Sequence, residues 1–184
     1  MPASVRRARG SETFEILREL GEKIQPSTAR WRSRTRLTRN FGGDRQHAEL
    51  GTGEETGLRL ALDTNRYTDL CRDDTSVFET VELAEEVWLP FIVLGELRAG
   101  FALGSQGPNN EAVLRRFLLK PRVRVLYADE QTTHHYAVVY RQLRKQGTPI
   151  PTNDMWIAAL VLQHSLTLCD RDAHFDALPQ LTRV

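Results

Sequence analysis

The chain has 184 residues, of which 40% are hydrophobic and 27% are charged, so it suits one globular domain with an appendage. Lys and Arg outnumber Asp and Glu by 11 to 8 in residues 1–57, but they are outnumbered by 16 to 14 in residues 58–184. The larger part is therefore slightly acidic, which argues against a broad basic platform for nucleic acid.

No run of eighteen apolar residues is present, so we expect no membrane span. The basic N-terminus lacks the apolar segment of a secretory signal peptide. Cys71 and Cys169 are far apart and form no C-x-x-C pair, so we expect reduced thiols in a cytoplasmic protein.

The first 57 residues differ in composition from the rest. Residues 12–23 place Phe14, Leu17 and Leu20 at helical spacing, which predicts a short amphipathic helix. Residues 26–57 have few large apolar side chains, so we expect 1–57 to be a poorly ordered basic extension. A solvated tail is the favoured interpretation. The alternative is an RNA-binding segment that uses five arginines: Arg30, Arg32, Arg34, Arg36 and Arg39.

From Leu58 onward, short apolar runs alternate with segments of helical periodicity. Strands are predicted over 58–62, 87–89, 123–127 and 166–169. Helices are predicted over 64–71, 77–86, 110–119, 130–146 and 153–164, and a further one begins at Pro90 and carries Glu96. Thr75 or Ser76 is the expected cap of the second helix, and Gly147 is the expected end of the helix over 130–146. This alternation predicts an α/β domain over 58–184 with a parallel central sheet.

Acidic side chains follow or flank the predicted strands. Asp63 closes the first strand, and Asp170 and Asp172 follow the last. Asp154 falls in the first turn of an apolar helix, and Glu96 lies inside another. Because ligands of open α/β sheets bind beyond the carboxyl ends of the strands, we expect these carboxylates to converge.

The carboxylates of such a cluster repel one another, and we expect no compensating Lys or Arg nearby in sequence. Divalent cations are its natural counterions, and hard oxygen ligands favour Mg²⁺ or Mn²⁺. Each residue also has a structural interpretation, because Asp63 can cap a helix, Asp154 suits a helix dipole, and Glu96 can reach solvent. Asp170 and Asp172 can form a polar turn. The joint arrangement favours the functional interpretation.

Four segments together resemble the VapC-like toxins of the PIN-domain family. They are residues 62–65, 95–100, 153–159 and 171–175, and they occur in the family's order over about 120 residues. The resemblance implies a PIN-like three-layer sandwich with a short, mostly parallel central sheet flanked by helices. No family role carries over to residues 1–57.

The resemblance also implies a metal-dependent endoribonuclease that hydrolyses RNA with Mg²⁺ or Mn²⁺. Its catalytic and metal-binding quartet would be Asp63, Glu96, Asp154 and Asp172. Asp170 stands where the family usually has Ser or Thr, so it is a candidate for a further metal contact or for altered metal affinity. Asn65 and Asn153 are the implied polar neighbours that orient the carboxylates. The implied partners are a small cognate antitoxin and a second copy in a homodimer.

Two other functions compete with this one. A catalytically silent RNA- or protein-binding module would gain nothing from clustered like charges. A phosphatase of the haloacid-dehalogenase type needs a second Asp two residues after its nucleophile, where this chain has Asn65. His164, Cys169 and His174 match no common zinc spacing and are expected to pack, with His174 anchoring the loop after Asp172.

Overall fold

The computed structural model describes residues 57–184. The predicted helix over residues 12–23 and the five arginines of the extension lie outside the described residues. The described residues contain four strands: β1 (Arg59–Leu62), β2 (Glu86–Pro90), β3 (Val123–Leu126) and β4 (Thr167–Cys169). The helices are α2 (Thr64–Leu70), α3 (Thr75–Leu83), α4 (Phe91–Leu103), α5 (Gly107–Leu118), α6 (Glu130–Gln146), α7 (Thr152–His164) and the 3-10 helix η1 (Ala173–Ala177).

The four strands form one parallel sheet in the order β3-β2-β1-β4. The register pairs Ala61 with Trp88 on one side of β1 and Leu62 with Cys169 on the other. Beyond β4, Arg183 forms an isolated parallel bridge with Leu168, so the final extended segment is as short as the sequence indicates. The parallel α/β prediction is confirmed.

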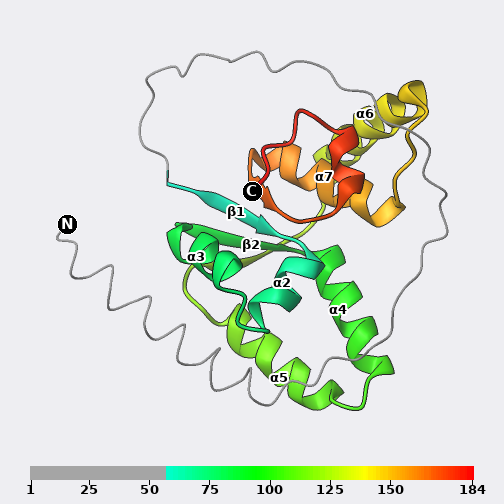
Figure 1. The fold of residues 1–184 in the computed structure, drawn as a ribbon. Coiled ribbons are helices and arrows are strands. Elements are labelled where there is room, and N and C mark those ends of the chain that lie inside the picture. The colour runs from blue at the N-terminus through cyan, green and yellow to red at the C-terminus, as the bar shows by residue number, and fades with distance from the viewer. Residues whose placement is uncertain (1–56) are drawn as a thin grey trace.

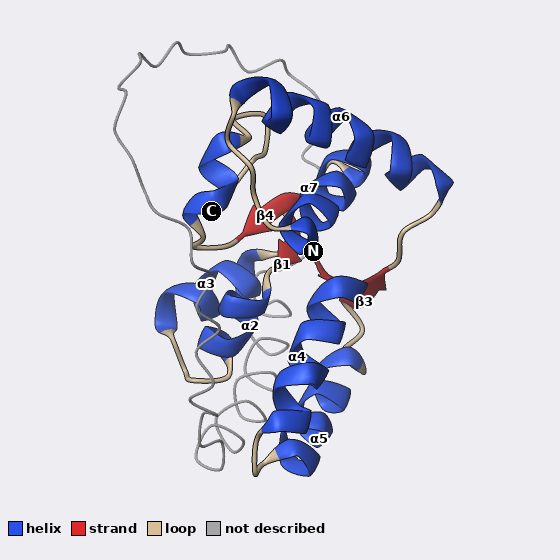
Figure 2. Ribbon diagram, turned by 90° about the vertical axis from the view of Figure 1, so that its right-hand side faces the viewer, coloured by secondary structure: helices blue, strands red, loops and turns tan. Residues whose placement is uncertain are grey.

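Helices cover both faces of this sheet (Figures 1 and 2). Helices α2 to α5 lie on one face, and α6 and α7 lie on the other. This follows from the strand order, because right-handed crossovers from β1 to β3 run in one direction and the return to β4 runs in the opposite direction. Apolar side chains fill both interfaces, and Leu60, Leu89, Ile157 and Leu168 are completely buried. The result is the predicted three-layer sandwich.

Local signals explain where most elements begin and end. Asp129 and Thr132 form a capping box at the start of α6, and Gly147 ends that helix with a φ of 70°. The cap predicted for the second helix was wrong, because Asp74 accepts hydrogen bonds from the backbone N–H groups of Ser76 and Val77. Asp is as good a cap as Ser, and Asp74 lies one residue before Thr75 and two before Ser76.

The chain moves from β1 towards β2 on one side, while β4 adds to β1 on the other side. The carboxyl ends of β1 and β4 therefore form a topological switch point, where open α/β sheets bind ligands. Within residues 57–184, no helix is long and apolar enough to cross a membrane. Cys71 and Cys169 are buried and free, as expected for reduced thiols.

Candidate active site

Two carboxylates lie side by side at the switch point. Asp63 follows β1 and Asp170 follows β4, and the backbone N–H of Asp63 donates to the carbonyl of Cys169 at 3.1 Å. Both residues are buried among apolar strand residues. Asp63 stands at the N-cap position of α2, yet its carboxylate makes no side-chain capping hydrogen bond. The structural interpretation of Asp63 as a helix cap therefore finds no support.

Glu96 is held by two neighbours from other parts of the chain. It lies on α4, which begins directly after β2, and so it reaches the same edge of the sheet. The hydroxyl of Thr64 donates to its Oε2, and Nδ2 of Asn153 donates to its Oε1 at 2.7 Å. Residues that follow β1 and begin α7 therefore orient one carboxylate.

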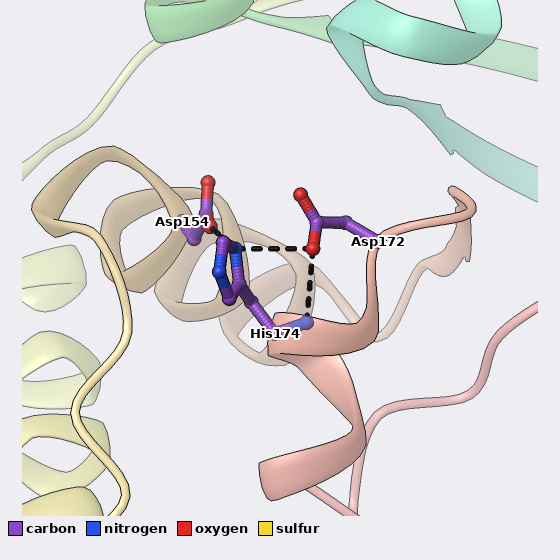
Figure 3. Close-up of side chains that lie close together, drawn as sticks. All are labelled: Asp154, Asp172 and His174. Atoms are coloured by element: carbon purple, nitrogen blue, oxygen red, sulfur yellow. Dashed lines mark hydrogen bonds and ion pairs between the residues drawn. The ribbon is translucent and has the colours of Figure 1, made fainter. Parts of the chain in front are cut away.

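Asp154, Asp172 and His174 form the third part of the site (Figure 3). Nδ1 of His174 lies 3.0 Å from Oδ2 of Asp154 and 3.0 Å from Oδ1 of Asp172. The backbone N–H of His174 also donates to Oδ1 of Asp172 at 3.0 Å. One ligand atom from each of the three residues lies within 4.8 Å of the other two. The first turn of α7 and the start of η1 thus converge.

The carboxylates of Asp63 and Asp154 resist ionisation. Burial is the main cause that raises the pKa of Asp63 to about 7, and repulsion from Asp154, Glu96 and Asp170 contributes to this rise, while the Thr64 backbone N–H opposes it. Burial is also the main cause that raises the pKa of Asp154 to about 6. His174 opposes this rise, while Asp172 and Glu96 add to it. All four predicted quartet members therefore interact electrostatically at one site.

Asp170 differs from the others because it is paired with a cation. Its carboxylate accepts from Nε of Arg183 at 2.9 Å and from Nη2 at 2.7 Å, and its side chain is fully buried. The expectation of no compensating Lys or Arg concerned residues nearby in sequence, whereas Arg183 lies 13 residues after Asp170. In the sequence, η1 lies between Asp172 and the segment that carries Arg183.

Comparison with known proteins gives a consistent result. The PIN domain model matches residues 60–181. Ribonuclease VapC4 of Mycobacterium tuberculosis is 32% identical over 120 residues, which cover 59% of this chain and 90% of that protein. The chain belongs to the PIN-domain family. Within that family it belongs to the group of VapC ribonuclease toxins.

Two further relatives support the PIN assignment. Ribonuclease VapC1 of Haemophilus influenzae is 46% identical over 81 residues, which cover 44% of this chain and 55% of that protein. The structure of VapBC-1 from nontypeable Haemophilus influenzae superposes with a TM-score of 0.62 at 27% identity, covering 69% of this chain and 97% of that chain. The predicted family and fold are confirmed.

The PIN site contains donors that suit a hard divalent cation. Its side chains offer carboxylate oxygens, which are the ligands that Mg²⁺ and Mn²⁺ prefer. Burial and mutual repulsion raise the pKa values of Asp63 and Asp154, and a bound divalent cation would offset both effects. Asp170 does not share this feature, because Arg183 already balances it.

The predicted neighbours of the quartet behave differently from one another. Asn153 contacts Glu96, whereas Oδ1 of Asn65 is buried and has no hydrogen-bond partner among residues 57–184. His174 was expected to pack and to anchor the loop, but its imidazole joins Asp154 to Asp172. The spacing rules for zinc sites do not detect it, because its partners are carboxylates and one lies twenty residues away.

Proposed function

We propose that this protein is a metal-dependent endoribonuclease that hydrolyses RNA phosphodiester bonds at the site formed by Asp63, Glu96, Asp154 and Asp172. The observation that carries the proposal is the convergence of these carboxylates from four separate segments, with the pKa of Asp63 raised to about 7. The ribonuclease class follows from the family. The assignment of the four residues and of Mg²⁺ or Mn²⁺ as the cofactor is our own.

The four acidic side chains have different roles in this reaction. A bound divalent cation would lower the pKa of the attacking water and balance the negative charge on the phosphate. Asp63, Asp154 and Asp172 would hold the cation with their free carboxylate oxygens. Glu96 is already oriented by Thr64 and Asn153 and would complete the acidic pocket. No side-chain nucleophile is required, because water is the attacking group.

The VapC type also supports a small cognate antitoxin as the protein partner. An antitoxin would silence the enzyme by covering the carboxyl edge of the sheet. A silent binding module is the second candidate function, and the metal experiment below distinguishes it. A phosphatase of the haloacid-dehalogenase type finds no support in the family match.

Removal of metal should abolish cleavage. Purified protein dialysed against EDTA should leave a labelled single-stranded RNA intact, because the clustered carboxylates cannot balance phosphate charge without a cation. Addition of Mg²⁺ or Mn²⁺ in excess should restore cleavage, measured as product bands over time. Cleavage that proceeds equally in EDTA would overturn the metal-dependent mechanism, and RNA binding without cleavage under all conditions would favour the silent module.

We also propose a homodimer, supported by an exposed aromatic pair. The rings of Phe91 and Tyr127 stack with centroids 6.4 Å apart, and 67% of Tyr127 is exposed. Exposed apolar groups of this kind mark interaction surfaces. Light scattering should give a dimer for the wild type, and Tyr127→Glu should weaken dimerisation by at least about tenfold because it buries an unpaired charge. A monomeric wild type at about 50 μM, well above a typical micromolar dissociation constant, would contradict this.

A further inference from the structure

Arg183 binds the acidic site from the last residues of the chain. Its backbone is fixed beside β4, because Leu168 donates to the carbonyl of Thr182 at 2.8 Å and accepts from the N–H of Val184 at 3.0 Å. Its guanidinium carbon lies 5.9 Å from the centre of the buried Phe175 ring. The C-terminal segment therefore delivers this cation to a defined place.

The guanidinium group makes four hydrogen bonds there. Two go to the carboxylate of Asp170, one goes from Nη2 to the backbone carbonyl of Asp172 at 3.0 Å, and one goes from Nη1 to Asp176. Oδ1 of Asp170 in turn accepts from the backbone N–H of Asp172 at 3.0 Å. Arg183 and Asp170 together thus bind both the N–H and the carbonyl of Asp172.

These contacts control where the Asp172 carboxylate lies. Its Oδ1 is directed at Nδ1 of His174, beside Oδ2 of Asp154, and the backbone that carries it is held by the contacts just described. A second consequence concerns charge. Asp170 is close enough to Asp63 to raise its pKa, and without Arg183 it would add an unbalanced fifth carboxylate to the pocket.

We propose that Arg183 is a positioning residue of the metal site. It fixes the turn that presents Asp172 beside Asp154, and it occupies Asp170 so that this carboxylate does not act as a ligand. The inference rests on the proposed metal-dependent function. Residues that hydrogen-bond to metal ligands and orient them typically contribute tenfold to a hundredfold to metal affinity.

The test is the affinity of the full chain for Mn²⁺, measured by isothermal titration calorimetry at a temperature where circular dichroism shows each variant to be folded. Arg183→Gln should raise the Kd for Mn²⁺ at least about tenfold, because Gln cannot bind both Asp170 oxygens and the Asp172 carbonyl. Arg183→Lys should give an intermediate Kd, because it keeps the charge and loses the planar fork. It also serves as the second variant if Arg183→Gln does not fold.

Two controls separate positioning from general stability. Arg122 matches Arg183 in exposure, and it binds Glu82 and the carbonyl of Ala84 at the opposite, amino end of the sheet. Arg122→Gln should lower the Tm and leave the Kd for Mn²⁺ unchanged. Asp176→Asn removes only the exposed partner of Arg183, so it should change neither quantity.

The possible failures are distinguishable. If the wild type binds Mn²⁺ and cleaves RNA while both Arg183 variants bind Mn²⁺ within twofold of the wild type, the positioning role is overturned and the proposed function stands. An equal loss of affinity in Arg122→Gln would also overturn it, because the effect would then reflect stability alone. If the wild type binds no Mn²⁺, both the metal-dependent function and the positioning role of Arg183 are contradicted.

Discussion

Asp63→Asn should abolish RNA cleavage while leaving the protein folded. Asparagine has nearly the same shape as aspartate but removes the negative charge that a divalent cation requires, so we expect a loss of at least about 100-fold in rate, which corresponds to about 2.7 kcal/mol of transition-state stabilisation. Asp154→Asn should have a similar effect, because it removes charge from the pocket and an acceptor for His174. The measurement is cleavage of a labelled RNA in the presence of Mg²⁺ or Mn²⁺.

Asp74→Asn is the matched control for these variants. Asp74 caps α3, where asparagine caps about as well as aspartate, and it takes no part in the contacts of the acidic site. Its activity and Tm should equal those of the wild type. Circular dichroism should confirm that all three variants are folded. Undiminished cleavage by both Asp63→Asn and Asp154→Asn would refute the assignment of the acidic site.

Most of the fold was predictable because its boundaries are determined by local chemistry. The limits of α6 follow from a capping box at one end and a glycine with positive φ at the other, and both are visible in the sequence. The start of α5 was less clear. It begins at Gly107, three residues before the predicted start at residue 110, because Pro108 in the first turn is compatible with a helix start.

The acidic residues of the site were also accessible to sequence reasoning, since a parallel sheet gathers residues that follow its strands. Asp63 and Asp170 meet because β1 and β4 are neighbours, and Asp154 joins them from the first turn of α7. The strand order cannot be predicted from any single segment of the sequence. The rule that crossovers between parallel strands are right-handed limits the possible orders.

The partners of the acidic residues were harder to predict. Arg183 reaches Asp170 because the chain returns to pair with Leu168, a contact that a single bridge stabilises and that no periodicity reveals. The sequence predicts a packing role for His174, whereas its imidazole lies between two carboxylates. Thr64 lies in the predicted helix, and its hydroxyl also orients Glu96. Each of these is a tertiary contact made by a residue type with several common roles.

The stability of the metal-free protein should depend on the charge of Asp63, and the dependence has a definite sign. The pKa of this carboxyl is raised from its ordinary value of 3.8 to about 7 in the fold, chiefly by burial. A group with a raised pKa favours the fold fully below its unfolded pKa, and this contribution is lost as the pH rises through its folded pKa. Metal-free wild type should therefore lose stability between about pH 4 and pH 7 from this group.

Asp63→Asn removes this loss of stability, so the free energy of unfolding of the variant should increase relative to that of the wild type as the pH rises. In EDTA, the difference in free energy of unfolding between variant and wild type should increase by at most about 4 kcal/mol from pH 4 to pH 8, since each pKa unit corresponds to about 1.4 kcal/mol. Urea unfolding followed by circular dichroism measures the difference. Saturating Mn²⁺ should reverse it at pH 8, because a bound cation stabilises the ionised wild-type site and has one ligand fewer in the variant. A difference that stays constant with pH in EDTA would mean that Asp63 is not held in a buried, negatively charged pocket, and the physical basis of the proposed metal site would be lost.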